Sequence, residues 1–392
     1  MDTPASDAQA VEKHIIPFEF TGNSSEFFSI WVVNVLLTIL TFGMYSPWAK
    51  VRTYQYFYGN TRLDGASFRY LASPVQILKG RLIALVFFAA WYFSGLISPA
   101  AAGVMIVIIA LLVPAMVVMS MSFQLRNTSH RNIKFNFQKD FKRAYTLFAF
   151  PLLFIVLYFL LITYFQSDAQ ANAVTTENET ETLPTVFLFA ALPLFIICLF
   201  PLWQYMMIKF KSTHAHFGQT HFSFDGTAGK FYRIYISAFL VIVLFGLLSA
   251  VVLGELKDVL AANEERSFLS TLLIVPLLGF FLLLPLYLWL LSYIRTKVIN
   301  FTFGNLSIAE HRVQSELKVG TMLYLYVTNT LAIVISLGLL IPWAKVRTAR
   351  YRVQMTSIIV AGSLDNFFGV QPNGQSAFGE EMGEVFDMGL GI

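Results

Sequence analysis

The sequence predicts an α-helical polytopic membrane protein with six full transmembrane helices, two short helical hairpins, a cytoplasmic layer of small β-hairpins, and internal repeats. Three observations lead to this fold class. Hydrophobic residues make up 56% of the 392 residues and charged residues only 13%, whereas soluble domains carry roughly 25% charged residues. Long apolar runs alternate with basic segments, and one seven-residue motif occurs twice.

Six apolar segments are long enough to span a bilayer, which takes about 20 largely apolar residues. These segments are residues 80–97, 101–123, 145–165, 184–208, 233–254 and 268–293. The first 16 residues are polar and mixed in charge, which is not the pattern of a cleavable signal peptide. The single cysteine, Cys198, argues against a disulfide framework, an iron–sulfur site or a thiolate zinc cluster.

Lys and Arg concentrate between the apolar pairs, and their position sets the expected orientation. We expect five basic segments to face the cytoplasm, namely 50–81, 124–143, 209–233, 295–318 and 345–352. The chain then has three regions: a flexible cytoplasmic N-terminus over 1–17, a repeat-built transmembrane domain over 18–365, and a mobile acidic tail over 366–392. The tail is a candidate handle for a membrane-protein partner or a protease.

The doubled motif is the most specific pattern in the sequence. Residues 47–53 read Pro-Trp-Ala-Lys-Val-Arg-Thr, and residues 342–348 repeat them, each with an Asn and a Gly at matching positions upstream. The apolar stretches 27–58 and 321–353 that carry the motif are too short for two crossings. Either each is a re-entrant helical hairpin, or each crosses once and continues as a surface helix. We favour re-entry, because a single crossing would put one basic motif outside.

A weaker pattern recurs five times at the ends of the apolar helices, where a polar residue precedes a two-residue turn and an alternating strand. The expected turns are Asp64-Gly65, Arg131-Asn132, Gly218-Gln219, Gly304-Asn305 and Ala361-Gly362. The polar residues before the first four turns are Asn60, Asn127, His214 and Asn300. Gly and Asn tolerate the positive φ that two-residue hairpins need. Because isolated hairpins are marginal in water, we expect them to pair into one small cytoplasmic sheet or barrel-like layer.

Several of these features resemble the YjgN family, a group of bacterial inner-membrane proteins of unknown function. They are the Gly-(x3)-Pro-Trp-Ala-(x2)-Arg motif, the stretch Asn34–Ile39, and the Phe-x-Phe-x-Gly start at Phe18. The resemblance covers roughly residues 17–390, and Phe18–Trp48 is its most specific part. It implies a bacterial inner-membrane location and brings no established catalytic or binding residues.

The two hairpins that carry the doubled motif are the best candidate for a functional site. Paired, Gly/Pro-interrupted apolar segments point to the binding site of a transporter, and an Arg near the hydrocarbon boundary is expected to face water or an anion. The predicted path for a small anionic or lipid-derived molecule comprises Asn34, Lys50, Arg52, Tyr56, Asn329, Lys345, Arg347 and Tyr351. The alternative is that these bases reach lipid phosphates and only fix the topology.

Other chemistry is weakly represented. His214, His216 and His221 lie close together in the expected hairpin and are a weak metal candidate, since no Cys or carboxylate adjoins them in sequence. No nucleophile–base motif or cofactor fingerprint is present, so we expect neither an enzyme nor a cofactor. Attraction to the lipid bilayer and its anionic headgroups explains the basic segments better than nucleic acid does.

Two functional hypotheses follow from the sequence. The leading one is a channel- or transporter-like inner-membrane protein that passes or binds a small anionic or lipid-derived molecule at the two basic hairpins. The alternative is a structural or envelope-maintenance protein, or an adaptor or client of another membrane protein.

Overall fold

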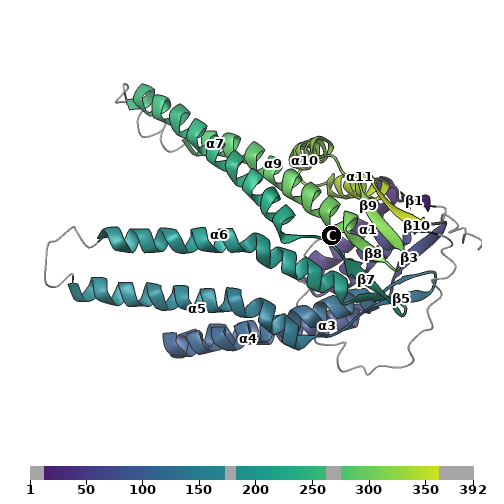
Figure 1. The fold of residues 1–392 in the computed structure, drawn as a ribbon, viewed down its shortest axis with the longest axis horizontal. Helices are drawn as coiled ribbons and strands as arrows, with labels where there is room; N and C mark the ends of the chain where they lie inside the picture. Colours follow the sequence, from purple (N-terminus) through teal and green to yellow (C-terminus); the bar gives the residue numbers. More distant parts are fainter. Residues whose placement is uncertain (1–12, 173–181, 262–274, 362–392) are drawn as a thin grey trace, which may run out of the picture. The chain divides into compact units, whose positions relative to one another are not determined.

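The computed structural model describes residues 13–172, 182–261 and 275–361 (Figure 1). The expected acidic tail, 366–392, lies outside these ranges. The strands are β1 (Lys13–Phe20), β2 (Thr61–Leu63), β3 (Ala66–Tyr70), β4 (Thr128–His130), β5 (Ile133–Phe137), β6 (Ala215–Phe217), β7 (Thr220–Phe224), β8 (Leu306–Ile308), β9 (His311–Ser315) and β10 (Thr356–Ala361). The helices are α1 (Ser24–Leu40), α2 (Ser46–Gly59), α3 (Pro74–Ile97), α4 (Pro99–Arg126), α5 (Phe141–Asn172), α6 (Thr182–Thr213), α7 (Ala228–Ala261), α9 (Val275–Gly304), α10 (Val319–Ile335) and α11 (Ile341–Gln354).

The described elements follow one another as five modules, each a strand, an outgoing helix, a return helix and a strand. Module 1 is β1-α1-α2-β2, module 2 is β3-α3-α4-β4, and module 3 is β5-α5-α6-β6. Module 4 contains β7, α7, α9 and β8, and module 5 is β9-α10-α11-β10. Strand β1 begins at Lys13, within the segment 1–17 that was expected to be flexible.

The strands close into an antiparallel barrel in the order β1-β10-β9-β8-β7-β6-β5-β4-β3-β2. Its first and last strands are neighbours, because β1 pairs with β10 through Pro17 and Ser357 and with β2 through Glu19 and Arg62. The hairpin turn between β2 and β3 places Asp64 and Gly65 at φ of 49° and 72°. A closed barrel leaves no edge strand that would pair with another chain.

Each module closes at its base through the same backbone hydrogen bond. The residue that follows the first strand donates its N–H to the carbonyl of the residue that directly follows the return helix. These bonds run from Thr21 to Asn60 (3.0 Å), Leu71 to Asn127 (2.8 Å), Gln138 to His214 (2.8 Å), Asp225 to Asn305 (3.0 Å) and Glu316 to Met355 (2.9 Å). Two segments far apart in sequence are thereby joined where the helices meet the barrel.

A side chain also ends the return helix in four of the five modules. A side-chain nitrogen of Asn or His contacts the carbonyl four residues earlier, and in modules 1, 2 and 3 this carbonyl also accepts from the backbone N–H of the same residue. The contacts are Asn60 Nδ2 to Tyr56 O (2.9 Å), Asn127 Nδ2 to Phe123 O (2.9 Å), His214 Nδ1 to Phe210 O (2.9 Å) and Asn305 Nδ2 to Phe301 O (2.6 Å). Short polar side chains therefore mark where each of these helices turns into a strand.

The core of each module lies beside this closure. The last residue of the first strand and the residue seven positions later are both buried in every module: Phe20 and Phe27, Tyr70 and Ile77, Phe137 and Ala144, Phe224 and Phe231, Ser315 and Met322. The residue four positions before the one that follows the return helix is aromatic each time: Tyr56, Phe123, Phe210, Phe301 and Tyr351. In module 1 the Phe27 and Tyr56 ring centroids are 5.0 Å apart, and in module 4 those of Phe231 and Phe301 are 4.9 Å apart.

The chain divides into two compact units, one formed mainly by modules 1, 4 and 5 and the other mainly by modules 2 and 3. In the first unit, α9 packs against α7, α10 and β9, and α11 packs against β1 (Figure 1). In the second unit, α4 packs against α3, α5 and β5, and α5 packs against α6 (Figure 1). In modules 2 to 5 the outgoing and return helices are direct neighbours.

The predicted fold class is wrong in two respects. In the described parts of the chain, three helices rather than six are long and apolar enough to cross a membrane: Pro74–Ile97, Pro99–Arg126 and Ala228–Val251. The strands form a closed ten-stranded barrel rather than a layer of small hairpins. The physical reason is that apolar runs and turn residues predict only local burial and local turns. Whether a helix crosses the membrane, and which hairpins pair with one another, depends on the whole chain.

Two of the five expected turns are also misplaced. Gly304 and Asn305 end α9, and the turn of that hairpin lies at Ala309 and Glu310, where Ala309 takes φ of 49°. Asn300 does not end the helix but bonds Leu317, accepting from its N–H and donating to its carbonyl. Ala361 ends β10, which pairs with β1 and β9, and Gly362 lies outside the described residues.

We expect Gly226→Ala to lower the free energy of unfolding by about 1–3 kcal/mol, because a methyl group there overpacks the module 4 core. A Cβ at Gly226 would lie 2.5 Å from Cζ of Phe224 and 2.8 Å from Cζ of Phe301. Gly229→Ala is the matched control, since a Cβ at Gly229 meets nothing within 4 Å. Denaturant unfolding of the detergent-solubilised protein measures both, and equal stability of the two variants would contradict this description of the core.

Candidate functional site

Modules 1 and 5, which carry the doubled motif, have helices and turns of the same dimensions. Helices α1 and α10 each have 17 residues, and α2 and α11 each have 14. The turn places Phe42 and Gly43 at φ of 50° and 89°, and Leu337 and Gly338 at 50° and 92°. A positive φ is uncommon for a residue other than Gly, so both tips use the same unusual backbone. We refer to α1-α2 and α10-α11 as the first and second hairpins.

The apolar residues of the doubled motif face the protein. Pro47 and Val51 are buried on α2, and Pro342 and Val346 are buried on α11. A spacing of four residues puts each pair on one side of its helix. The basic residues occupy the other sides, where Arg52 and Lys345 are exposed and Lys50 and Arg347 are half-buried.

A polar network joins the two helices of the second hairpin. Asn329 on α10 is buried, and its Nδ2 donates to Thr348 Oγ1 at 3.0 Å and to the Ala344 carbonyl at 3.4 Å. Arg347 Nη1 donates to Asn329 Oδ1 at 3.2 Å and to Thr328 Oγ1 at 2.6 Å. The Arg347 guanidinium lies 5.2 Å from the ring centroid of Tyr324 and 5.0 Å from that of Trp343. The predicted site residues Asn329 and Arg347 are therefore in direct contact.

The two predicted tyrosines close the bases of the hairpins. Tyr56 Oη accepts from the Asn23 N–H and donates to the Asn23 carbonyl, both at 2.7 Å. Tyr351 Oη accepts from the Lys318 N–H at 2.9 Å. The equivalent positions in modules 2, 3 and 4 hold Phe123, Phe210 and Phe301. The ring position is thus common to all five modules, and the hydroxyl adds a hydrogen bond to the start of α1 or α10.

The predicted residues of the first hairpin differ in their exposure. Asn34 is buried on α1, with 4% of its surface exposed, whereas Arg52 is exposed on α2. Tyr56 belongs to a core cluster with Phe20, Phe27 and Val346. Use of the eight residues as a path for a small molecule stays a prediction from the sequence.

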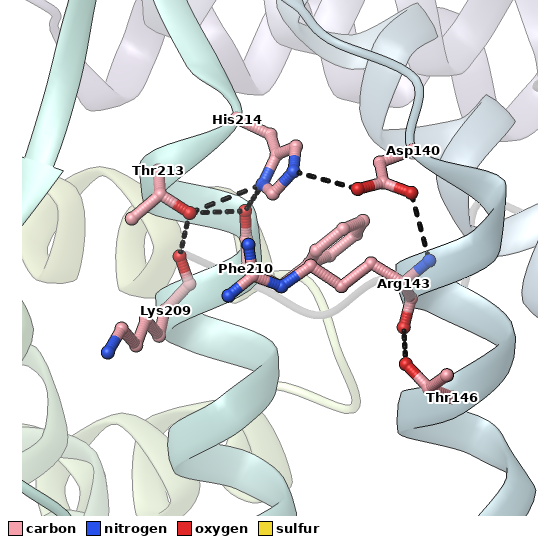
Figure 2. A network of polar contacts seen from close by, with 7 residues as sticks. All are labelled: Asp140, Arg143, Thr146, Lys209, Phe210, Thr213 and His214. Carbon is pink, nitrogen blue, oxygen red and sulfur yellow. Dashed lines mark hydrogen bonds and ion pairs between the residues drawn. The ribbon is translucent and has the colours of Figure 1, made fainter.

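A histidine–aspartate contact that the sequence did not suggest lies in module 3 (Figure 2). His214 is buried at the end of α6, and its Nε2 lies 3.6 Å from Oδ2 of Asp140, which directly precedes α5. His214 Nδ1 faces the Phe210 carbonyl at 2.9 Å. Because a carbonyl only accepts hydrogen bonds, Nδ1 carries a proton there. The two residues are distant in sequence, so only the folded module brings them together.

Asp140 also begins helix α5. Its Oδ1 accepts from the Arg143 N–H at 2.9 Å, which is the geometry of an N-terminal cap. This hydrogen bond holds the pKa of the Asp140 carboxyl below its ordinary value, against the opposing effect of burial and with a smaller contribution from attraction to His214. The cap and the histidine contact both favour the ionised carboxylate.

The three candidate metal ligands are not arranged around one point. His216 and His221 are cross-strand partners whose ring centroids lie 4.0 Å apart, while His214 turns toward Asp140 and Phe210. Burial, followed by the neighbouring His221 and His214, lowers the pKa of His216. Within the described ranges, no group of three or more His, Cys, Asp or Glu side chains is placed to hold a metal ion.

The apolar helices α3, α4 and α7, together with the exposed apolar hairpins, define a helical membrane protein. The chain belongs to the family described as a bacterial protein of unknown function (DUF898), which matches residues 15–385. The resemblance to the YjgN family is therefore confirmed.

Curated relatives of the chain carry the name of inner-membrane proteins. The chain is 26% identical over 370 residues to Inner membrane protein YjgN of Salmonella typhimurium, with 91% of each chain covered. It is 24% identical over 379 residues to Inner membrane protein YjgN of an Escherichia coli strain, with 92% of each chain covered. No solved structure matches the chain.

We expect Asp140→Asn to lower the thermal unfolding midpoint near neutral pH, because it removes a negative charge from the N-terminus of α5 while keeping a capping oxygen. The folded-state pKa of Asp140 lies below the ordinary 3.8, so its stabilising effect is present above about pH 4 and is lost as the pH falls below that value. Thermal unfolding across a pH series measures the difference between the two proteins. Asp225→Asn, at an exposed aspartate before α7, is the control. A difference that is absent at neutral pH, or unchanged in acid, would contradict the assignment.

Proposed function

We propose that this is a bacterial inner-membrane protein that binds anionic lipid headgroups at its two short hairpins, which insert into the cytoplasmic leaflet. The proposal covers a lipid and any lipid-derived molecule with the same phosphate headgroup. The observation that carries it is the apolar tip of each hairpin, where large apolar side chains are exposed. The inner-membrane location is taken from the names of the relatives.

The tips expose large apolar side chains where the chain turns. Phe42 is 98% exposed and Leu337 is 94% exposed, and both lie between apolar neighbours such as Leu40 and Leu339. Full exposure of such side chains to water would forgo roughly 1.5–3 kcal/mol of burial free energy for each one. Lipid is the medium in which the same surface is favourable.

The hairpins are too short to cross. A helix of 17 residues, the length of α1 and α10, spans about 25 Å, whereas the hydrocarbon core is about 30 Å thick. The return helices α2 and α11 are shorter still. This supports an insertion that enters and leaves on the same side.

The charges of the hairpins lie at a suitable distance from the tips. Lys345 is four residues into α11 and Arg352 is eleven, so these bases lie about 6 to 17 Å from its start. A hairpin whose tip is buried by about 5–10 Å would hold them among the headgroups.

One contact supports this shallow depth for the first hairpin. Arg81 on α3 donates to Oγ of Ser46, which begins α2 close to the tip. Arg81 is seven residues into α3, about 10 Å along a helix that is long enough to span. The tip of the first hairpin is thus level with the first part of a membrane helix.

Passage of the bound molecule across the bilayer, as in a channel or transporter, stays a prediction from the sequence. The alternative function, an adaptor or client of another membrane protein, requires no preference for anionic lipid. Measuring that preference therefore distinguishes it from lipid binding.

We expect a fluorescent probe at Phe42→Cys or Leu337→Cys, with Cys198→Ser, to be quenched by lipids brominated on their acyl chains, because both tips are inserted. Glu310→Cys, in the exposed β8–β9 turn, is the control and should be quenched only by a water-soluble agent. The measurement uses the full chain in proteoliposomes. Tip probes that behave like the Glu310 probe would rule out insertion.

We expect the double variant Arg52→Gln, Arg347→Gln to reduce the enrichment of phosphatidylglycerol around the protein by about 10- to 30-fold, since each base near an anionic surface contributes about 1 kcal/mol. Spin-labelled phosphatidylglycerol in phosphatidylcholine vesicles reports this enrichment. Arg312→Gln, which removes an exposed base from barrel strand β9, is the matched control. If the double variant and the control retain the same enrichment, the hairpins do not bind anionic lipid.

A further inference from the structure

The two copies of the motif differ in the residues that surround their arginine. Tyr324 and Thr328 on α10 contact Arg347, and the corresponding positions on α1 hold Ser29 and Val33. Val33 has no hydrogen-bonding group and Ser29 has no ring. In addition, the Trp48 ring stacks on Tyr45 with centroids 6.0 Å apart, whereas its counterpart Trp343 lies against Arg347. The identical heptapeptide is therefore set in two different environments.

Arg347 is held in one orientation by four neighbours. Thr328 and Asn329 accept from Nη1, and the rings of Tyr324 and Trp343 each lie close to the guanidinium. Ordering an Arg side chain costs conformational entropy. Folding already orders the Arg347 side chain, so a ligand that binds its guanidinium loses less conformational entropy on binding. This preorganisation raises the affinity of that ligand.

The orientation leaves part of the guanidinium available. Its hydrogen bonds to the described residues all involve Nη1, so Nε and Nη2 donate to no acceptor in that part of the chain. A guanidinium presents two parallel N–H groups that match two oxygens of one phosphate. Arg347 is six residues into α11, about 9 Å from its start, which is the headgroup level for a tip inserted as proposed above.

We infer that Arg347 is a specific phosphate-binding residue for an anionic phospholipid headgroup, with Tyr324 and Trp343 beside it and Thr328 and Asn329 as positioning residues. The first hairpin has Ser29 and Val33 in place of Tyr324 and Thr328, so Arg52 is expected to bind phosphate less specifically than Arg347. This inference rests on the proposed function, because it requires the second hairpin to lie in the headgroup region.

The loss test compares single variants of the full chain in phosphatidylcholine nanodiscs with spin-labelled phosphatidylglycerol. We expect Arg347→Gln to weaken association about tenfold, as for loss of a charge-assisted hydrogen-bonded pair, and Arg52→Gln to weaken it by less than about twofold. Arg347→Lys keeps the charge but not the planar pair of donors, so it should also weaken association several-fold. Equal effects of Arg347→Gln and Arg52→Gln would overturn the inference and leave the proposed function standing, whereas no effect of the double variant would overturn both.

A second test adds contacts around Arg52 rather than removing them, so its result does not depend on variants that could fail to fold. Ser29→Tyr with Val33→Thr rebuilds the Tyr324 and Thr328 contacts around Arg52, and we expect it to make Arg52→Gln as harmful in that background as Arg347→Gln is in the natural chain. Inorganic phosphate added to the same nanodiscs separates the two sources of phosphate. Displacement of the spin-labelled lipid by millimolar phosphate, or no new sensitivity at Arg52, would overturn the assignment to a lipid headgroup at a built site.

Discussion

The backbone hydrogen bond at the base of each module is the interaction on which the rest of the structure depends. It ties the residue after one strand to the residue that directly follows the return helix, from Thr21 and Asn60 in module 1 to Glu316 and Met355 in module 5. With this bond in place, the two strands of a module leave the helices at a fixed separation. The strands are only three to eight residues long. Such short strands pair correctly only if their ends are held at a fixed separation by the helices. Buried aromatic rings beside the bond exclude water from it, which favours its formation over solvation of the same groups.

The same base accepts helical hairpins of very different length. Modules 1 and 5 carry helices of 17 and 14 residues, whereas α5 and α6 in module 3 have 32 each. Only the base is common to all, so the length and surface of the helices have been free to differ. The short hairpins carry the doubled basic motif close to exposed apolar tips, and this is why the proposed lipid contacts concentrate there. The same division between a common part and a variable part is found around Arg347. Its heptapeptide is identical in the two short hairpins, whereas its neighbours Tyr324 and Thr328 occur only in the second hairpin.

Sequence patterns predicted the local features of this fold and missed those that depend on distant partners. The turns at Asp64-Gly65 and Arg131-Asn132 were found because Gly and Asn mark positive φ, and the structure has it at both. The turn at Ala309 was missed because Ala carries no such signal, and nearby Gly304, at the end of a helix, gave a false one. The contact of His214 with Asp140 joins two modular segments that no local pattern relates. The sequence predicted that Tyr56 and Tyr351 line a path for a small molecule. In the structure their hydroxyls accept hydrogen bonds from the backbone of Asn23 and Lys318.

The pairing of β1 with β10 has a consequence for how the protein is made. Strand β1 leaves the ribosome first and β10 almost last, yet they are neighbours in the barrel. Modules 1 to 4 can each complete their own base while synthesis continues, but the ring cannot be joined until translation has passed Ala361. Until then the nascent chain exposes an unpaired strand segment at Lys13–Pro17, which a chaperone or the translocation machinery would have to shield.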